Sequence, residues 1–211
     1  MTEPIKVEKK TSWKQTSLTW GLMLALFLFM RYTDQGTVLQ GWLQQGLLYT
    51  GIMQADVRYA EDNNVPADFN LSLTSLDGEA LTLESLRGKT IFMNFWATWC
   101  APCLAEMPYI ENLYQDMKDE NVAFVLVSTD DDIEVAKRFV EAKGYSMPIY
   151  RFAGNIPDMY NIRSLPTTYV ISPSGTMATV HFGMANYDTR GFRKFLRETM
   201  DQQATPPALQ P

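Results

Sequence analysis

The chain has 211 residues, 46% of them hydrophobic, which is enough for one domain with a sizeable core plus additional segments. Its formal net charge is −6 and it lacks a basic patch, which argues against nucleic-acid binding. Two cysteines and one histidine are too few for a disulfide-stapled secreted scaffold or for a closed structural zinc site.

The N-terminal part has the charge order of a membrane anchor. Residues 1–16 are polar and contain four lysines, and an uncharged apolar run, Leu18 to Met30, follows them. With its flanks, over residues 17–33, this run reaches the length of a short transmembrane helix, roughly 17 residues. A cleaved signal peptide has the same order, but Arg31 to Gln35 offer no small-residue cleavage site. We therefore expect an uncleaved inner-membrane anchor, a cytoplasmic tail over 1–16, and the rest of the chain on the periplasmic side.

Residues 34–65 precede the folded domain. Residues 35–55 carry no charge, and glycine recurs in them every five residues, a period that matches neither helix nor strand. On a helical wheel most apolar residues fall on one side and most glutamines on the other, which favours an amphipathic helix at the membrane surface or on the domain. An irregular linker and a second membrane span are the alternatives. The glutamines weigh against the span, because buried amides are costly in lipid.

Strand and helix patterns alternate over residues 66–201. Turn residues Asp77-Gly78 and Ser174-Gly175 predict two hairpins. The expected strands are Asp68–Leu73, Ala80–Leu83, Thr90–Trp96, Val122–Ser128, Thr167–Ile171 and Thr176–Phe182. The expected helices are Ala101–Asp119, Ile133–Lys143 and Thr189–Met200. This order predicts an α/β fold, a central mixed sheet flanked by helices, and the Pro-rich residues 202–211 predict a disordered tail.

The two cysteines form a Cys-x-x-Cys motif, Cys100-Ala101-Pro102-Cys103, where a buried strand gives way to a helix. The unpaired N–H groups and the positive partial charge of a helix N-terminus favour a thiolate there. Cys100, at the helix edge, is expected to attack, and Cys103, one turn further, to resolve the mixed disulfide. Pro102 suits the helix start, where its missing N–H is not needed. We expect this redox-active pair to work without a further cofactor and without a metal.

Three stretches resemble the TlpA/ResA family of membrane-tethered thioredoxin-like proteins. NFWATWCAPCLAEMP, from Asn94 to Pro108, resembles the family's active site, and LPTTYVISPSG, from Leu165 to Gly175, its segment around a cis-proline. SLDGEALTLESLRGKTIFMNFW, residues 75–96, resembles its N-terminal hairpin and first core strand. The resemblance covers residues 66–200. It implies a thioredoxin fold with an extra N-terminal β-hairpin and a central insertion, to which Ser128–Met147 would contribute most.

The resemblance also assigns roles on the client side of the motif. It makes Pro166 the cis-proline, which would leave a backbone edge at Leu165 open for strand addition by a client peptide. Pro102 would face the client as well. Trp99 would form part of an exposed apolar collar, whereas Trp96 is expected in the core.

Beneath the motif, the resemblance concerns proton transfer. Asn94 lies where ordinary thioredoxins carry a buried aspartate, and an amide cannot carry the proton. Glu106 lies three residues after Cys103, on the same helix face. In the family a glutamate here sits beneath the active site, which implies a proton-handling role. A plain surface charge is the alternative for Glu106.

Together these features predict an extracytoplasmic thiol–disulfide reductase. The resemblance implies clients such as apocytochrome c during cytochrome c biogenesis, and a membrane thiol transporter as electron donor. Ala101 and Pro102 provide no charge, and a carboxylate at Glu106 would oppose thiolate formation, so we expect a low reduction potential. The alternatives are a disulfide oxidase or isomerase, and a non-catalytic tethered binding or copper-delivery module.

Overall fold

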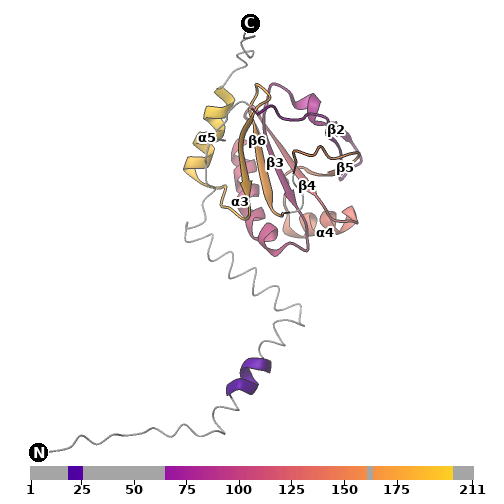
Figure 1. Cartoon of the computed structure of the whole chain (residues 1–211), viewed down its shortest axis with the longest axis vertical. Coiled ribbons are helices and arrows are strands. Elements are labelled where there is room, and N and C mark those ends of the chain that lie inside the picture. The colour runs from indigo at the N-terminus through magenta and orange to yellow at the C-terminus, as the bar shows by residue number, and fades with distance from the viewer. Residues whose placement is uncertain (1–18, 26–64, 161–163, 202–211) are drawn as a thin grey trace, which may run out of the picture. The chain divides into compact units, whose positions relative to one another are not determined.

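The computed structural model describes residues 19–25, 65–160 and 164–201 (Figure 1). Residues 19–25, inside the predicted anchor, are helical and exposed. Within the described ranges, no helix is both long and apolar enough to cross a membrane. The rest of the predicted anchor, the tails over 1–16 and 202–211, and residues 34–64 lie outside the described residues. The anchor and its flanking segments therefore stay predictions.

A seven-stranded mixed sheet organises the folded domain, in the order β2-β1-β5-β4-β3-β6-β7 (Figure 1). The strands are β1 Ser72–Ser75, β2 Ala80–Thr82, β3 Thr90–Trp96, β4 Val122–Ser128, β5 Ile149–Phe152, β6 Thr167–Ile171 and β7 Met177–Phe182. In the centre, β3 pairs parallel with β4 and antiparallel with β6. The predicted mixed sheet is confirmed, as are the two hairpins, β1–β2 and β6–β7.

Three helices cover one face of the sheet: α3 Ala101–Met117, α4 Ile133–Lys143 and α5 Arg190–Asp201. The units β3-α3-β4 and β4-α4-β5 step in the same direction across the sheet, so two right-handed crossovers place α3 and α4 on the same face. Phe92 of β3 meets Phe192 of α5 at 6.0 Å between ring centroids, and Trp96 meets Phe139 of α4 at 5.8 Å. These contacts pack β3, the strand that leads into the cysteine motif, against α5 and α4.

The opposite face is covered without a long helix. Alternate residues of β3, among them Ile91 and Phe95, are buried there under residues 67–71, the 3-10 helix η1 (Leu83–Leu86) and the loop after β5. Tyr160 of that loop lies 6.2 Å from the Phe95 ring. Because both faces of β3 are buried, its sequence is apolar at almost every position.

The predicted strand Asp68–Leu73 is wrong over its first four residues, Asp68–Leu71, because β1 begins only at Ser72. Alternate side chains before Ser72 do point inward, as in a strand. The backbone N–H groups there, however, do not form the regular hydrogen bonds of a β-ladder. The Ala67 N–H donates to the Gly175 carbonyl at 2.9 Å, and the Asn70 N–H donates to the Asp68 side chain at 2.8 Å. At the other end of the hairpin, β2 stops at Thr82, and Leu83, predicted in the strand, begins η1.

One strand was missed. Strand β5 has four residues, includes the charged Arg151, and lies between β1 and β4. Its pairing partners, rather than its own pattern, make it a strand. The chain between β4 and β6 thus contains α4 and then β5, so the predicted insertion over Ser128–Met147 includes the helix but stops short of the strand.

Candidate active site

Cys100 and Cys103 are joined by a disulfide at the N-terminus of α3. Cys100 is the N-cap residue, and its Sγ accepts a hydrogen bond from the Cys103 N–H at 3.3 Å. Pro102 lies in the first turn of the helix, as expected. The Cys100 side is 6% exposed whereas Cys103 is 0% exposed. Both cysteines are buried, and Cys100 is the slightly more exposed of the two, which is compatible with the predicted order of attack. The order itself stays a prediction.

Asp130 holds the loop between β3 and the disulfide. Its carboxylate accepts from the Thr98 N–H at 3.1 Å, from the Thr98 hydroxyl at 2.7 Å and from the Ser128 hydroxyl at 2.8 Å. The Thr129 N–H also donates to the Trp96 carbonyl, at 2.8 Å. The sequence analysis missed Asp130. A signal was available, because Asp130 is the second residue after β4, and an acidic residue there lies at the carboxyl edge of a parallel strand, where sites form.

Glu106 is the central group beneath the disulfide. It is 0% exposed, so the surface-charge alternative is wrong. Its Oε1 accepts from Asn94 Nδ2 at 2.8 Å, and its Oε2 accepts from the Ala185 N–H at 3.1 Å. Burial raises the pKa of Glu106 to about 8, although both hydrogen bonds act in the opposite direction. A carboxyl with this pKa exchanges a proton near neutral pH, one helical turn from Cys103.

Two residues that the sequence analysis did not single out extend this polar cluster. Asn94 Nδ2 also donates to Thr168 Oγ1 at 2.9 Å, and the Tyr187 hydroxyl donates to the same oxygen at 2.7 Å. Thr168 lies in β6 and Tyr187 lies between β7 and α5, and both are buried. Burial raises the pKa of Tyr187 well above its ordinary value, so it remains a hydroxyl donor. No local sequence pattern could have revealed these contacts between distant segments.

The Leu165–Pro166 peptide is cis, which confirms the prediction for Pro166. Thr167 pairs with both Phe95 and Phe182. One edge of the sheet is therefore formed by strand ends: the carboxyl end of β3, the start of β6 and the end of β7. Next to this pairing the Gly183 N–H donates to the Pro166 carbonyl at 2.8 Å. The cis-proline loop therefore lies at the same sheet edge as the disulfide.

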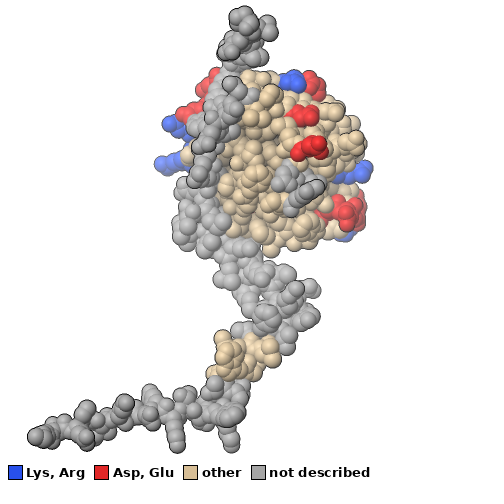
Figure 2. Space-filling view, in the orientation of Figure 1, with Lys and Arg blue, Asp and Glu red and all other residues tan. Residues whose placement is uncertain are grey.

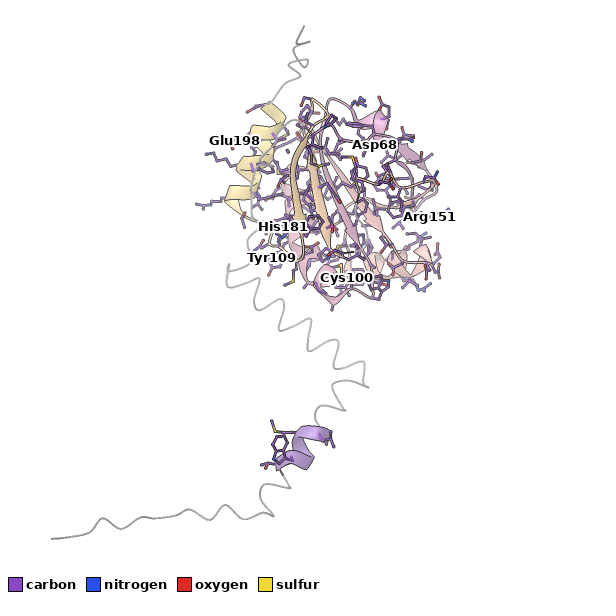
Figure 3. All side chains as sticks on the ribbon, viewed as in Figure 1. Asp68, Cys100, Tyr109, Arg151, His181 and Glu198 are labelled. Atoms are coloured by element: carbon purple, nitrogen blue, oxygen red, sulfur yellow. A yellow bond between two sulfur atoms is a disulfide. The ribbon has the colours of Figure 1, made fainter. Side chains whose placement is uncertain are left out.

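Large apolar side chains are exposed at this edge. Trp99, directly before Cys100, is 70% exposed, and Phe182, opposite Thr167, is 56% exposed. Leu165 is half-buried. Figure 3 shows Cys100 and His181, the neighbour of Phe182, toward the same end of the domain. Phe182 was missed because its strand pattern alone does not distinguish a buried from an exposed final residue.

The described residues contain no group of three or more His, Cys, Asp or Glu side chains that could hold a metal ion. The chain's single histidine, His181, contacts the Tyr187 ring at 6.3 Å between centroids. The redox group of this site is the Cys100–Cys103 disulfide itself.

Comparison with known proteins identifies the family. The redoxin family model matches residues 60–183, more than half of the chain. The chain belongs to the redoxin family. A ResA thiol-disulfide oxidoreductase of Halalkalibacterium halodurans is 42% identical over 115 residues, which cover 54% of this chain and 65%, just under two thirds, of the relative. The ResA protein of Oceanobacillus iheyensis is 35% identical over 139 residues, which cover 64% of this chain and 72% of the relative.

The structural comparison agrees with this redoxin assignment. A thioredoxin-family thiol:disulfide interchange protein from Chlorobium tepidum is 25% identical, with a TM-score of 0.54, and the match covers 69% of this chain and 99% of that one. The predicted thioredoxin-like fold is therefore confirmed, together with the similarity to ResA proteins. The chain is a redoxin with a redox-active disulfide, an oxidoreductase.

The burial of the two cysteines predicts which of them forms a mixed disulfide. Cys103→Ser keeps the accessible nucleophile and removes the resolving thiol, so covalent client complexes should accumulate. Cys100→Ser should trap far less, because Cys103 is fully buried. Non-reducing electrophoresis of each variant after incubation with a disulfide-containing protein measures this. Equal trapping by the two variants would contradict the assigned roles.

The buried carboxyl predicts a stability that depends on pH. The pKa of Glu106 is raised on folding from 4.5 to about 8, so the folded state binds the extra proton between these values and loses stability as the pH rises. Relative to Glu106→Gln, the wild-type free energy of unfolding should fall by about 1.4 kcal/mol per pH unit across this interval and level off above it.

Urea denaturation of the oxidised protein at a series of pH values tests this. The matched control is Glu79→Gln, which removes an exposed carboxylate from the β1–β2 turn and should give no comparable slope against wild type. A constant difference between wild type and Glu106→Gln at every pH would show that Glu106 titrates as an ordinary carboxylate.

Proposed function

We propose that this redoxin is a membrane-anchored reductase that acts on disulfides of client proteins outside the cytoplasm. One observation carries the proposal: Cys103, which is 0% exposed, is followed one helical turn later by a fully buried titratable carboxyl, Glu106, while Cys100, at the N-cap, keeps a small exposure of 6%. Two thiols with these different exposures suit an ordered, two-step exchange.

In the first step the Cys100 thiolate attacks one sulfur of a client disulfide. The client S–S bond breaks, a Cys100–client disulfide forms, and the second client sulfur leaves as a thiolate that takes a proton from water. The helix N-terminus and the Cys103 N–H, 3.3 Å from Cys100 Sγ, favour the attacking thiolate.

In the second step the Cys103 thiol transfers its proton to the Glu106 carboxylate. The Cys103 thiolate then attacks Cys100 Sγ, which breaks the Cys100–client disulfide, closes the Cys100–Cys103 disulfide and releases the first client sulfur, the one that Cys100 had attacked, as a thiolate. Two electrons have passed to the client. Because Cys103 has no contact with bulk water, Glu106 is the group on the same helix face that can take its proton.

The client surface is the apolar sheet edge around the disulfide. Exposed Trp99 and Phe182 flank the region where Leu165 and Pro166 lie. An extended client segment could pair with the Leu165 backbone by strand addition, while apolar side chains of the client contact the two rings. The roles of Trp99, Pro102 and Leu165 in client binding are part of this proposal.

The surroundings of the disulfide favour reduction of the client. Ala101 and Pro102 carry no charge and no side-chain donor, and one backbone N–H donates to Cys100 Sγ. A strong oxidant instead needs a greatly stabilised thiolate. Because burial raises the pKa of Glu106 to about 8, the carboxyl is partly protonated near neutral pH and opposes the thiolate less than a fully ionised group would. The main argument for a low reduction potential is therefore that Ala101 and Pro102 provide no group that would stabilise the Cys100 thiolate.

The proposal predicts a reduction potential near −270 mV, the value for thioredoxin, rather than near −120 mV, the value for a strong oxidant, both approximate. That gap is about 7 kcal/mol at roughly 1.4 kcal/mol per 30 mV, enough to decide the direction. Equilibration of the full-length protein in defined dithiothreitol or glutathione buffers measures the potential. A value near the oxidant limit would contradict the reductase assignment and favour a disulfide oxidase or isomerase. Absence of insulin reduction would favour a non-catalytic tethered module.

For partners, we propose cysteine-containing clients, with apocytochrome c as the example that the family resemblance implies. A membrane thiol transporter would return electrons to the Cys100–Cys103 disulfide. The proposed location is the inner membrane, with one span over residues 17–33 and the catalytic domain on the periplasmic side. The lysines that precede the apolar run support this orientation.

A reporter that is active only outside the cytoplasm tests the orientation. Fused after Met200, it should be active, because one span places the domain outside. Fusion after Asp34 should give the same result. If the Asp34 fusion is active and the Met200 fusion is silent, residues 35–55 cross the membrane a second time and the proposed location is wrong.

A further inference from the structure

The side-chain amide of Asn94 is placed asymmetrically in the buried cluster. Its nitrogen, Nδ2, lies between two acceptors, Glu106 Oε1 at 2.8 Å and Thr168 Oγ1 at 2.9 Å. Its oxygen, Oδ1, is buried and has no hydrogen-bond partner among the described residues. A buried acceptor without a partner is uncommon, so this one requires an explanation.

The observed orientation suits one protonation state of Glu106. An amide nitrogen has two hydrogens, and here one points to Glu106 and the other to Thr168. The Ala185 N–H donates to the second Glu106 oxygen. An ionised carboxylate accepts both bonds and has no hydrogen of its own. The hydrogen bonds observed in the cluster therefore fit an ionised Glu106 carboxylate.

A Glu106 that is protonated on Oε1, the oxygen next to Asn94, reverses the requirement. A hydrogen on Oε1 would point at Nδ2, which cannot accept it. A half-turn of the amide about its last bond would put Oδ1 in the place of Nδ2, where it accepts from the Glu106 hydroxyl and from the Thr168 hydroxyl. The two Nδ2 hydrogens would then need acceptors at the buried position that Oδ1 leaves. Thr168 Oγ1 can still accept from Tyr187, because a hydroxyl donates once and accepts twice.

We infer that Asn94 is a positioning residue whose amide turns over when Glu106 gains or loses its proton, with Thr168 and Tyr187 fixing the far side of the cluster. The inference rests on the proposed role of Glu106 as acceptor of the Cys103 proton. Each time Glu106 takes that proton, Asn94 changes from donor to acceptor and keeps the carboxyl in place beneath the disulfide. A second carboxyl at this position would instead compete for the proton, because two close carboxyls titrate as a coupled pair.

The titration of Glu106 can be measured separately from that of the groups that face it. Cys103 precedes it by one turn on α3, and Tyr187 approaches from the segment between β7 and α5. In the oxidised protein Cys103 is in the disulfide and does not titrate. Tyr187 keeps its proton, since burial raises its pKa well above the ordinary value. His181 of β7, whose ring contacts Tyr187, is the remaining group to control.

Nuclear magnetic resonance of the oxidised, full-length protein labelled at asparagine and glutamate tests the inference. At alkaline pH the Asn94 Nδ2 hydrogens should show a nuclear Overhauser effect to the Thr168 methyl group. This effect should be lost on acidification, with the same midpoint as the Glu106 carboxyl carbon shift. In Glu106→Gln the amide should keep one orientation at every pH, and in His181→Asn the wild-type transition should persist.

Two results would overturn the inference. The first affects this inference alone, and the second also affects the proposed role of Glu106. If the Glu106 carbon titrates while the Asn94 effect stays constant, the amide is fixed and only this inference fails. If the Glu106 carbon does not titrate between about pH 6 and about pH 10, the proposed proton-accepting role of Glu106 fails with it.

Discussion

The burial of one carboxyl, that of Glu106, is the constraint on which the active site depends. Burial alone disfavours the charged form, and two donors, from Asn94 and the Ala185 backbone, partly offset it. The resulting pKa of about 8 makes the group a usable proton acceptor near neutral pH. A carboxyl at the surface would have an ordinary pKa and could not serve a thiol buried in the domain.

The fold provides this environment by bringing four segments together. Strand β3 contributes Asn94, β6 contributes Thr168, α3 contributes Glu106, and the segment after β7 contributes the Ala185 N–H. Aromatic packing around the central strand fixes the distances, and the charged side chains in view lie mostly toward the rim of the described surface (Figure 2). The same sheet edge also exposes Trp99, so the proposed client contact and the proposed proton transfer would lie on opposite sides of one disulfide.

Local patterns predicted the motif well and its surroundings poorly. The cysteine pair, α3 and the buried central strands follow from short-range spacing, and the cis-proline follows from family resemblance. The register of Glu106 with Cys103 was also predictable. Its burial was not, because its backbone donor comes from Ala185, 79 residues away. Strand β5 was missed for a similar reason, since only its neighbours in the sheet define it.

The most direct test of the account is the resolution rate of a Cys100–client mixed disulfide as a function of pH. If Glu106 accepts the Cys103 proton, Glu106→Gln should resolve the complex more slowly at pH 7, by about 10²-fold or more, with an altered pH profile and an unchanged fold. The exposed control Glu79→Gln should match wild type. Wild-type rates in Glu106→Gln at every pH would contradict the account.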